Sequence, residues 1–148
     1  MTTVAYKDGI MVSDTCISRG GIRLCKYENK VGRGFGGSIW GFSGDLSVQP
    51  YFVAWVQHED NMNYRVQIPS KLIGEFECIH VTPDGKIYLV SRTNLVYMKN
   101  VKFAAVGSGS LLALGAMEQG ATAAEAVRIA CKHDGFSRLP LKKISLFK

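Results

Sequence analysis

Threonine at position 2 has two chemically useful groups on one residue once Met1 is removed. A small second residue favours removal of the initiator methionine, so the sequence predicts Thr2 as the mature N-terminus. The side-chain hydroxyl could then act as a nucleophile and the α-amine as its base, because a free α-amine has a pKa near ~8 and is partly neutral at cellular pH. An acylated amine cannot accept a proton. This chemistry therefore requires the loss of Met1.

A carboxylate is expected close to this terminus. The short apolar runs 3–6 and 10–13 surround Lys7-Asp8-Gly9, and Asp-Gly between such runs is typical of a tight β-turn. The sequence thus predicts an N-terminal β-hairpin. Antiparallel pairing would bring Asp14, at the end of the second strand, beside the start of the first.

A second polar turn follows the apolar run 103–106. It reads Gly107-Ser108-Gly109 and precedes a helical pattern. Such a turn could bind phosphate at a helix N-terminus. No lysine of a phosphate-binding loop follows, however, so an ordinary strand-to-helix turn is the favoured interpretation.

The other elements follow from apolar periodicity and from the positions of glycine and proline. The capping-box pair Thr122 and Glu125 predicts the start of a helix that runs to about His133, with Ala126, Val127, Ala130 and Cys131 buried. Two more helices are predicted, from shortly after Gly44 to 58–60 and over 110–119. The remaining predictions are strands at 38–42, 76–81, 86–91, 95–98, 103–106 and 144–147, an extended segment at 21–31 and an irregular one at 61–74. This order predicts an α+β sandwich with mostly antiparallel sheets.

Composition narrows the class of protein. The chain has 148 residues, 47% of them hydrophobic and 20% charged, which predicts one globular domain. Its four cysteines have no metal-ligand spacing, so we expect reduced thiols in a cytoplasmic protein without a metal or cofactor. Apolar runs are too short for a membrane span, and no secretory signal is evident. The net charge of +6 is spread along the chain, which does not favour nucleic acid as a partner.

Four motifs resemble a known family. The opening TTVAYKDGIMVSDT is similar to that of proteasome β-subunits and of HslV, which are N-terminal nucleophile hydrolases. The similarity continues through NKVGR (29–33), IWGFSGD (39–45) and the block 104–134, whereas 57–100 matches weakly. Within the family, the chain looks like the compact proteasome-like proteins of phages and bacteria. The resemblance implies a single proteasome-like domain over 1–148, a four-layer αββα sandwich and threonine endopeptidase activity.

The resemblance also implies roles for individual residues. In this family a lysine lies beside the nucleophile, an aspartate fixes the lysine, a glycine amide binds the oxyanion, and serines with a second aspartate surround the terminal amine. The implied catalytic residues are Thr2, Asp14, Lys30, Gly44, Ser108, Asp134 and Ser137, and the implied substrate-binding residues are Ser18 and Phe42.

The chain departs from the family pattern in four places. The segment between Asp14 and Lys30 is a few residues short, so Lys26 is an alternative for the catalytic lysine. Three further differences are Cys16 in place of an arginine, Asp45 in place of a second glycine, and Arg138 after Ser137. Phe42 also fits a core position, and Asp134 fits an ordinary helix end.

Three functions stay open at this stage. The first is a peptidase that cleaves peptides or unfolded proteins, assembled as a homo-oligomeric ring and fed by an ATP-dependent unfoldase. The second is a non-catalytic structural or assembly subunit of the same fold, which retention of Met1 would favour. The third is an N-terminal nucleophile amidase that acts on small amides, for which a monomer with an open pocket would be evidence.

Overall fold

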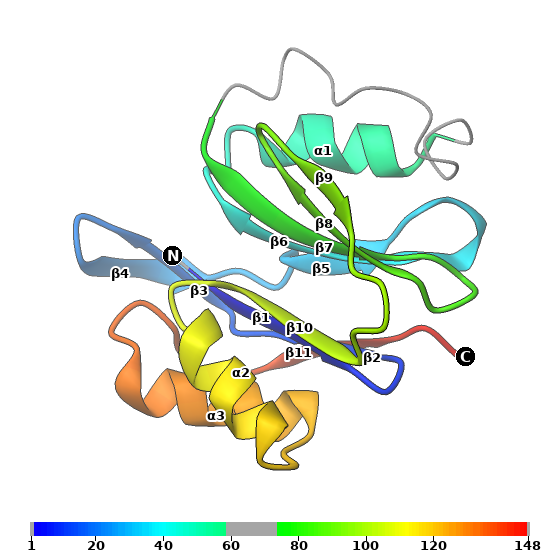
Figure 1. Cartoon of the computed structure of the whole chain (residues 1–148). Helices are drawn as coiled ribbons and strands as arrows, with labels where there is room; N and C mark the ends of the chain where they lie inside the picture. Colours follow the sequence, from blue (N-terminus) through cyan, green and yellow to red (C-terminus); the bar gives the residue numbers. More distant parts are fainter. Residues whose placement is uncertain (1, 59–73, 148) are drawn as a thin grey trace.

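Two antiparallel sheets face each other across the centre of the molecule (Figure 1). The computed structural model describes residues 2–58 and 74–147. The first sheet has the order β10-β1-β2-β11, and the second has the order β5-β6-β7-β8-β9. The strands of the first sheet are β1 (Thr3–Lys7), β2 (Ile10–Ser13), β10 (Phe103–Gly107) and β11 (Lys142–Ser145). Those of the second are β5 (Val31–Arg33), β6 (Ile39–Gly44), β7 (Phe76–Val81), β8 (Ile87–Ser91) and β9 (Leu95–Tyr97).

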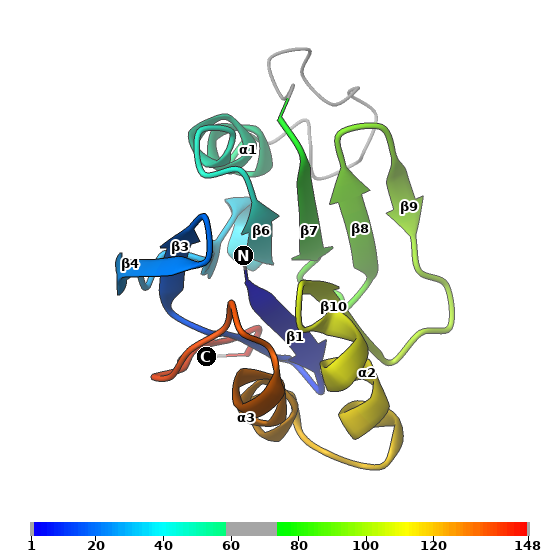
Figure 2. The same ribbon diagram turned by 90° about the vertical axis from the view of Figure 1, so that its left-hand side faces the viewer.

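Helices cover the outer faces of both sheets. Helix α1 (Gln49–Val56) packs on the second sheet, and helices α2 (Ser110–Glu118) and α3 (Ala123–His133) pack on the first (Figure 2). Period-two alternation along the strands supplies the apolar faces. On β7, for example, Cys78 packs towards α1 whereas Ile79 packs between the sheets. The described residues therefore form a mixed α and β fold built on antiparallel sheets.

The predicted N-terminal hairpin is confirmed. Strands β1 and β2 pair from Val4–Ser13 to Lys7–Ile10, which leaves Asp8 and Gly9 as a two-residue turn. Both turn residues have positive φ, +52° and +79°. Right-handed strand twist favours this turn type, and Asp-Gly accommodates it well.

The predicted capping box of α3 is also confirmed. The Thr122 hydroxyl accepts a bond from the Glu125 N–H, and the Glu125 carboxylate accepts one from the Thr122 N–H, each at 3.1 Å. Ala126, Val127 and Ala130 are buried as expected, while Cys131 is half-buried. Pro50 lies in the first turn of α1, where the missing N–H costs nothing.

Two strand predictions were wrong in detail. The segment 21–31 is not one extended run, because a turn at 29–30 separates β4 (Ile22–Lys26) from β5. A strand that the sequence did not predict, β3 (Cys16–Arg19), pairs with β4 across a turn at Gly20 and Gly21, both with positive φ. The last strand is 142–145 rather than 144–147, because its register with β2 places Lys142 opposite Ser13. Residues 61–73 of the predicted irregular segment lie outside the described residues. Between β5 and β6, residues 35–37 form a short 3₁₀ turn. Among the helices described, none is long and apolar enough to cross a bilayer.

Candidate active site

Asp14 is the centre of a buried hydrogen-bond network at the start of β1. Its Oδ1 accepts from the Thr3 N–H at 3.1 Å and from Lys30 Nζ at 3.0 Å. Its Oδ2 accepts from the N–H groups of Cys16 at 3.2 Å and Arg138 at 3.1 Å. The side chain has no exposed surface. Four donors, one of them a cation, compensate for the cost of burying this carboxylate.

The structure distinguishes between the two lysines left open by the sequence. Lys30 has only 3% of its side chain exposed, and its ammonium contacts both the Asp14 carboxylate and the Cys16 carbonyl. Lys26 instead pairs with Glu28 on the surface, where both side chains are 52% exposed. Only Lys30 is therefore positioned to place a buried positive charge at the beginning of the chain.

Asp134 is the centre of a second network, which reaches Thr2. The Ser108 hydroxyl lies 2.6 Å from Asp134 Oδ2 and 3.4 Å from the Thr2 carbonyl oxygen. A hydroxyl has one proton, and the shorter contact, to a charged acceptor, is the stronger bond. Ser137 also lies 2.6 Å from Asp134 Oδ2. Both serines thus donate to one carboxylate beside the first residues of the chain.

Thr3 links the two networks, and no sequence pattern pointed to this role. Its hydroxyl lies 2.7 Å from that of Ser137, while its N–H donates to Asp14. Because Ser137 donates to Asp134, Thr3 is the donor in the hydroxyl pair. The Arg138 N–H, next along the chain from Ser137, donates to Asp14 as well. Because Arg138 contributes its backbone N–H, its residue type could not have predicted this hydrogen bond.

Glycines on both sides of Ser108 allow close approach to the first residues. A Cβ at Gly107 would lie 1.9 Å from the Thr2 carbonyl oxygen, and a Cβ at Gly109 would lie 2.0 Å from the Thr3 hydroxyl. Gly107 also has φ of +98°, which disfavours other residues. The Gly-Ser-Gly turn therefore packs its backbone directly against Thr2 and Thr3.

Gly44 ends β6 in a conformation that favours glycine. Its φ is +135°, and a Cβ there would lie 2.5 Å from the Glu75 carbonyl oxygen. The preceding residue, Ser43, reaches the same place as Thr2, because a Cβ at Gly107 would meet its hydroxyl at 2.9 Å. The end of β6 thus approaches the beginning of β1, which is where an oxyanion donor would be needed.

The two predicted substrate-binding residues have different surroundings. The Phe42 ring is buried in the core beneath α1. It stacks on Phe76, with ring centroids 5.9 Å apart, and packs against Phe52, with ring centroids 5.8 Å apart. Only its backbone reaches the site, through an N–H bond of 2.8 Å to the Lys30 carbonyl. Ser18 is half-buried on β3, opposite Arg23 and next to an irregularity in the pairing. Their substrate-binding roles stay predictions.

The Cys131 thiol lies near both networks but is poorly suited to act as a nucleophile. Burial raises its pKa to about 11, and the negative charges of Asp14 and Asp134 add to that effect. Lys30 and Arg138 oppose it less strongly. The thiol is therefore protonated at neutral pH. Across 2–58 and 74–147, no three histidine, cysteine or acidic side chains gather as metal ligands.

Comparison with known proteins supports the resemblance at the level of fold. No family model and no curated protein matches the sequence. Among solved structures, HslV from Trypanosoma brucei is similar with a TM-score of 0.73 and 17% identity, over 97% of this chain and 98% of that one. The chain has the HslV-like fold. The resemblance to proteasome β-subunits and HslV is thereby confirmed as a structural one.

The chain is also similar in structure to BPH from Thiobacillus denitrificans. The BPH structure gives a TM-score of 0.68 and 21% identity, over 98% of this chain and 97% of that one. A complex of BPH with epoxomicin gives a TM-score of 0.64 and 22% identity, over 99% of both chains. At such identities the likeness shows the fold alone, so the roles of individual residues rest on the geometry described above.

Proposed function

We propose that this chain is a threonine-type peptidase whose nucleophile is Thr2 after removal of Met1. The observation that carries the proposal is the meeting of two polar networks at residues 2 and 3. One contains the buried Asp14–Lys30 ion pair, and the other contains Asp134 with two serines. A network with a buried cation next to a terminal threonine suits nucleophilic catalysis.

The proposed reaction begins at Thr2. Its α-amine, directly or through a water molecule, takes the hydroxyl proton, and the oxygen attacks a peptide carbonyl. The Lys30 cation favours the neutral amine and the developing alkoxide, while Asp14 fixes the lysine in place. The Thr2 ester then forms as the amine product leaves with a proton. Water finally hydrolyses the ester and regenerates the hydroxyl.

The remaining predicted residues stabilise charge during these steps. The Gly44 N–H would donate to the oxyanion, and removal of one such donor costs about 3 kcal/mol in a hydrolase. Asp134, with Ser108 and Ser137, would stabilise the ammonium that forms on Thr2. Their convergence on the Asp134 carboxylate supports this role.

We further propose the assembly and setting implied by the family resemblance. The chain would be one domain over 1–148, a four-layer αββα sandwich, acting in the cytoplasm as a homo-oligomeric ring that an ATP-dependent unfoldase supplies with substrate. Native mass spectrometry would show a ring, whereas a monomer would favour the amidase alternative.

The peptidase proposal is tested by hydrolysis of an unfolded protein such as casein. We expect Thr2→Ala to abolish cleavage while its thermal unfolding stays close to wild type, and Thr2→Ser to keep part of the activity. The matched control is Thr93→Ala, in an exposed turn between β8 and β9. Full turnover by Thr2→Ala would disprove the assignment. A purified protein that retains Met1 and cleaves nothing would indicate a structural subunit.

A further inference from the structure

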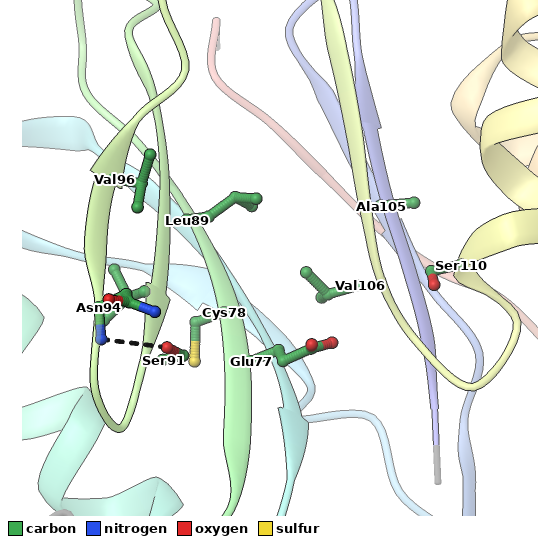
Figure 3. A pocket seen from close by; sticks show the side chains of 10 residues that line it. Glu77, Cys78, Leu89, Ser91, Asn94, Val96, Ala105, Val106 and Ser110 are labelled. Carbon is green, nitrogen blue, oxygen red and sulfur yellow. Dashed lines mark hydrogen bonds between the residues drawn. The ribbon is translucent and has the colours of Figure 1, made fainter.

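A cavity of about 270 Å³ lies between β7, β8 and β9 on one side and β10 on the other (Figure 3). Aliphatic side chains of Leu89, Val96 and Val106 form much of its wall, and Ser91 and Asn94 add polar groups. Sites for drug-sized ligands have roughly 300–1,000 Å³. This cavity is therefore suited to one side chain rather than to a whole small-molecule ligand.

Among the described residues that line the cavity, Glu77 is the only one with a charged side chain. Alternation along β7 places it on the same face as Ile79 and Val81, which pack in the core between the sheets, but Glu77 itself is exposed near the end of the strand. Its carboxylate points towards β10 in Figure 3. Burial raises the pKa of the neighbouring Cys78 thiol well above its ordinary value, so that group is uncharged.

The Glu77 carboxylate has no cationic partner within the described part of the chain. Within the described residues, its carboxylate accepts one hydrogen bond, from the Gly107 N–H, and the N···O distance of 3.4 Å is long. None of the ion pairs formed within 2–58 and 74–147 includes it. The exposed carboxylate is therefore unpaired with any cation of 2–58 and 74–147.

The cavity also lies next to the site around Thr2. Gly107, which donates to Glu77, is the residue whose Cβ would contact the Thr2 carbonyl oxygen, and it pairs with Thr3 across the sheet. Paired strands are about 5 Å apart. A substrate residue close to the bond attacked by Thr2 could therefore reach this cavity with its side chain.

We propose that this cavity is a subsite for a basic side chain, lysine or arginine, of the peptide substrate. The inference rests on the proposed peptidase function and adds its substrate class. The aliphatic stem would pack against Leu89, Val96 and Val106, while the cationic head pairs with Glu77. An uncharged side chain of the same length would lose the ion pair and keep only the apolar contact.

A binding experiment tests the subsite without any need for catalysis. Wild-type protein with labelled leucine and valine methyl groups is titrated with Nα-acetyl-lysine N-methylamide and with its norleucine analogue, and methyl NMR shifts are followed. We expect saturable shifts at Leu89, Val96 and Val106, with the norleucine probe about fivefold weaker, as for a partly exposed ion pair. Glu77→Gln should remove the difference between the probes, and the exposed control Glu118→Gln should not. Equal binding of the two probes, or no shift at these methyls, would overturn the inference.

Product mapping then separates this inference from the peptidase proposal. Casein fragments made by wild type should be enriched in lysine or arginine at one position near the cleaved bond. Glu77→Gln should lose that enrichment while still cleaving, and Glu77→Lys should reverse it towards acidic residues. Cleavage with no basic preference contradicts the subsite alone. Absence of cleavage together with Glu77-dependent binding of the lysine probe contradicts the peptidase and leaves a site for cationic side chains.

Discussion

Asp14 and Asp134, which both belong to hydrogen-bond networks around Thr2 and Thr3, have opposite environments. Asp14 is fully buried, is paired with a cation and accepts three backbone N–H bonds. Asp134 is half-buried and accepts bonds from two hydroxyl groups. Hydroxyl bonds can be exchanged for water, but a buried ion pair cannot be replaced so easily. We therefore expect loss of the Asp14 network to cost more stability than loss of the Asp134 network.

The largest expected effect follows from removal of the buried carboxylate. Asp14→Ala would leave the Lys30 ammonium and three backbone donors without their acceptor, so we expect a loss of about 3–5 kcal/mol in the free energy of unfolding. Urea denaturation measures it. Lys26→Met, which breaks only a surface ion pair, should change stability by less than about 0.5 kcal/mol. Equal effects for the two variants would mean that the burial of Asp14 does not have the energetic weight given to it here.

The pH dependence of stability tests another buried titratable group, His80, against the two aspartates. Burial lowers the pKa of His80 from 6.5 to about 4. The unfolded chain therefore takes up a proton before the folded one, so this contribution to stability is complete above pH 6.5 and is lost as the pH falls towards 4. The loss amounts to about 3 kcal/mol. His80→Gln should flatten the profile over that range in urea titrations. An unchanged slope in that variant would assign the pH dependence to other groups.

The smallest expected effect on stability belongs to the Asp134 network. Ser137→Ala removes one hydroxyl donor to Asp134 and the acceptor for the Thr3 hydroxyl, so we expect a loss of about 1–2 kcal/mol in the free energy of unfolding. Casein hydrolysis should fall more than stability suggests, because the terminal ammonium would be less well stabilised. A stability loss as large as that of Asp14→Ala would remove the proposed difference between the two networks.

Local sequence signals predicted the parts of the site that depend on short spacing. The Asp-Gly turn brought Asp14 to the first strand, and the Thr122–Glu125 capping box defined the start of α3. The choice of Lys30 over Lys26 could not be made from spacing, because it depends on which side chain is buried: Lys26 lies opposite Cys16 on β4 but pairs with Glu28 on the surface, whereas Lys30 follows the hairpin and pairs with Asp14. Contacts between residues far apart in the chain could be predicted even less well from the sequence.

Two such contacts show why. The Arg138 N–H donates to Asp14 although the two residues lie far apart in the sequence. Nearly every residue type has a backbone N–H, so the residue type does not show which N–H will donate. The cavity beside Glu77 exists because β7 and β10 belong to different sheets that face each other. Neither strand alone predicts it. The mixed α and β class and the hairpins β1–β2 and β7–β8 were thus accessible from local patterns, whereas the β3–β4 hairpin and the distribution of buried charge required tertiary structure.

Reaction with epoxomicin tests the central claim most directly. An epoxyketone has two electrophilic carbons, so it can bond to both the hydroxyl and the free amine of a terminal threonine. Wild-type protein would be treated with epoxomicin, digested and analysed by mass spectrometry. We expect a mature chain that begins at Thr2, with one inhibitor added to that residue and none added in Thr2→Ala. A chain that keeps Met1, or an adduct elsewhere with Thr2 unmodified, would contradict it.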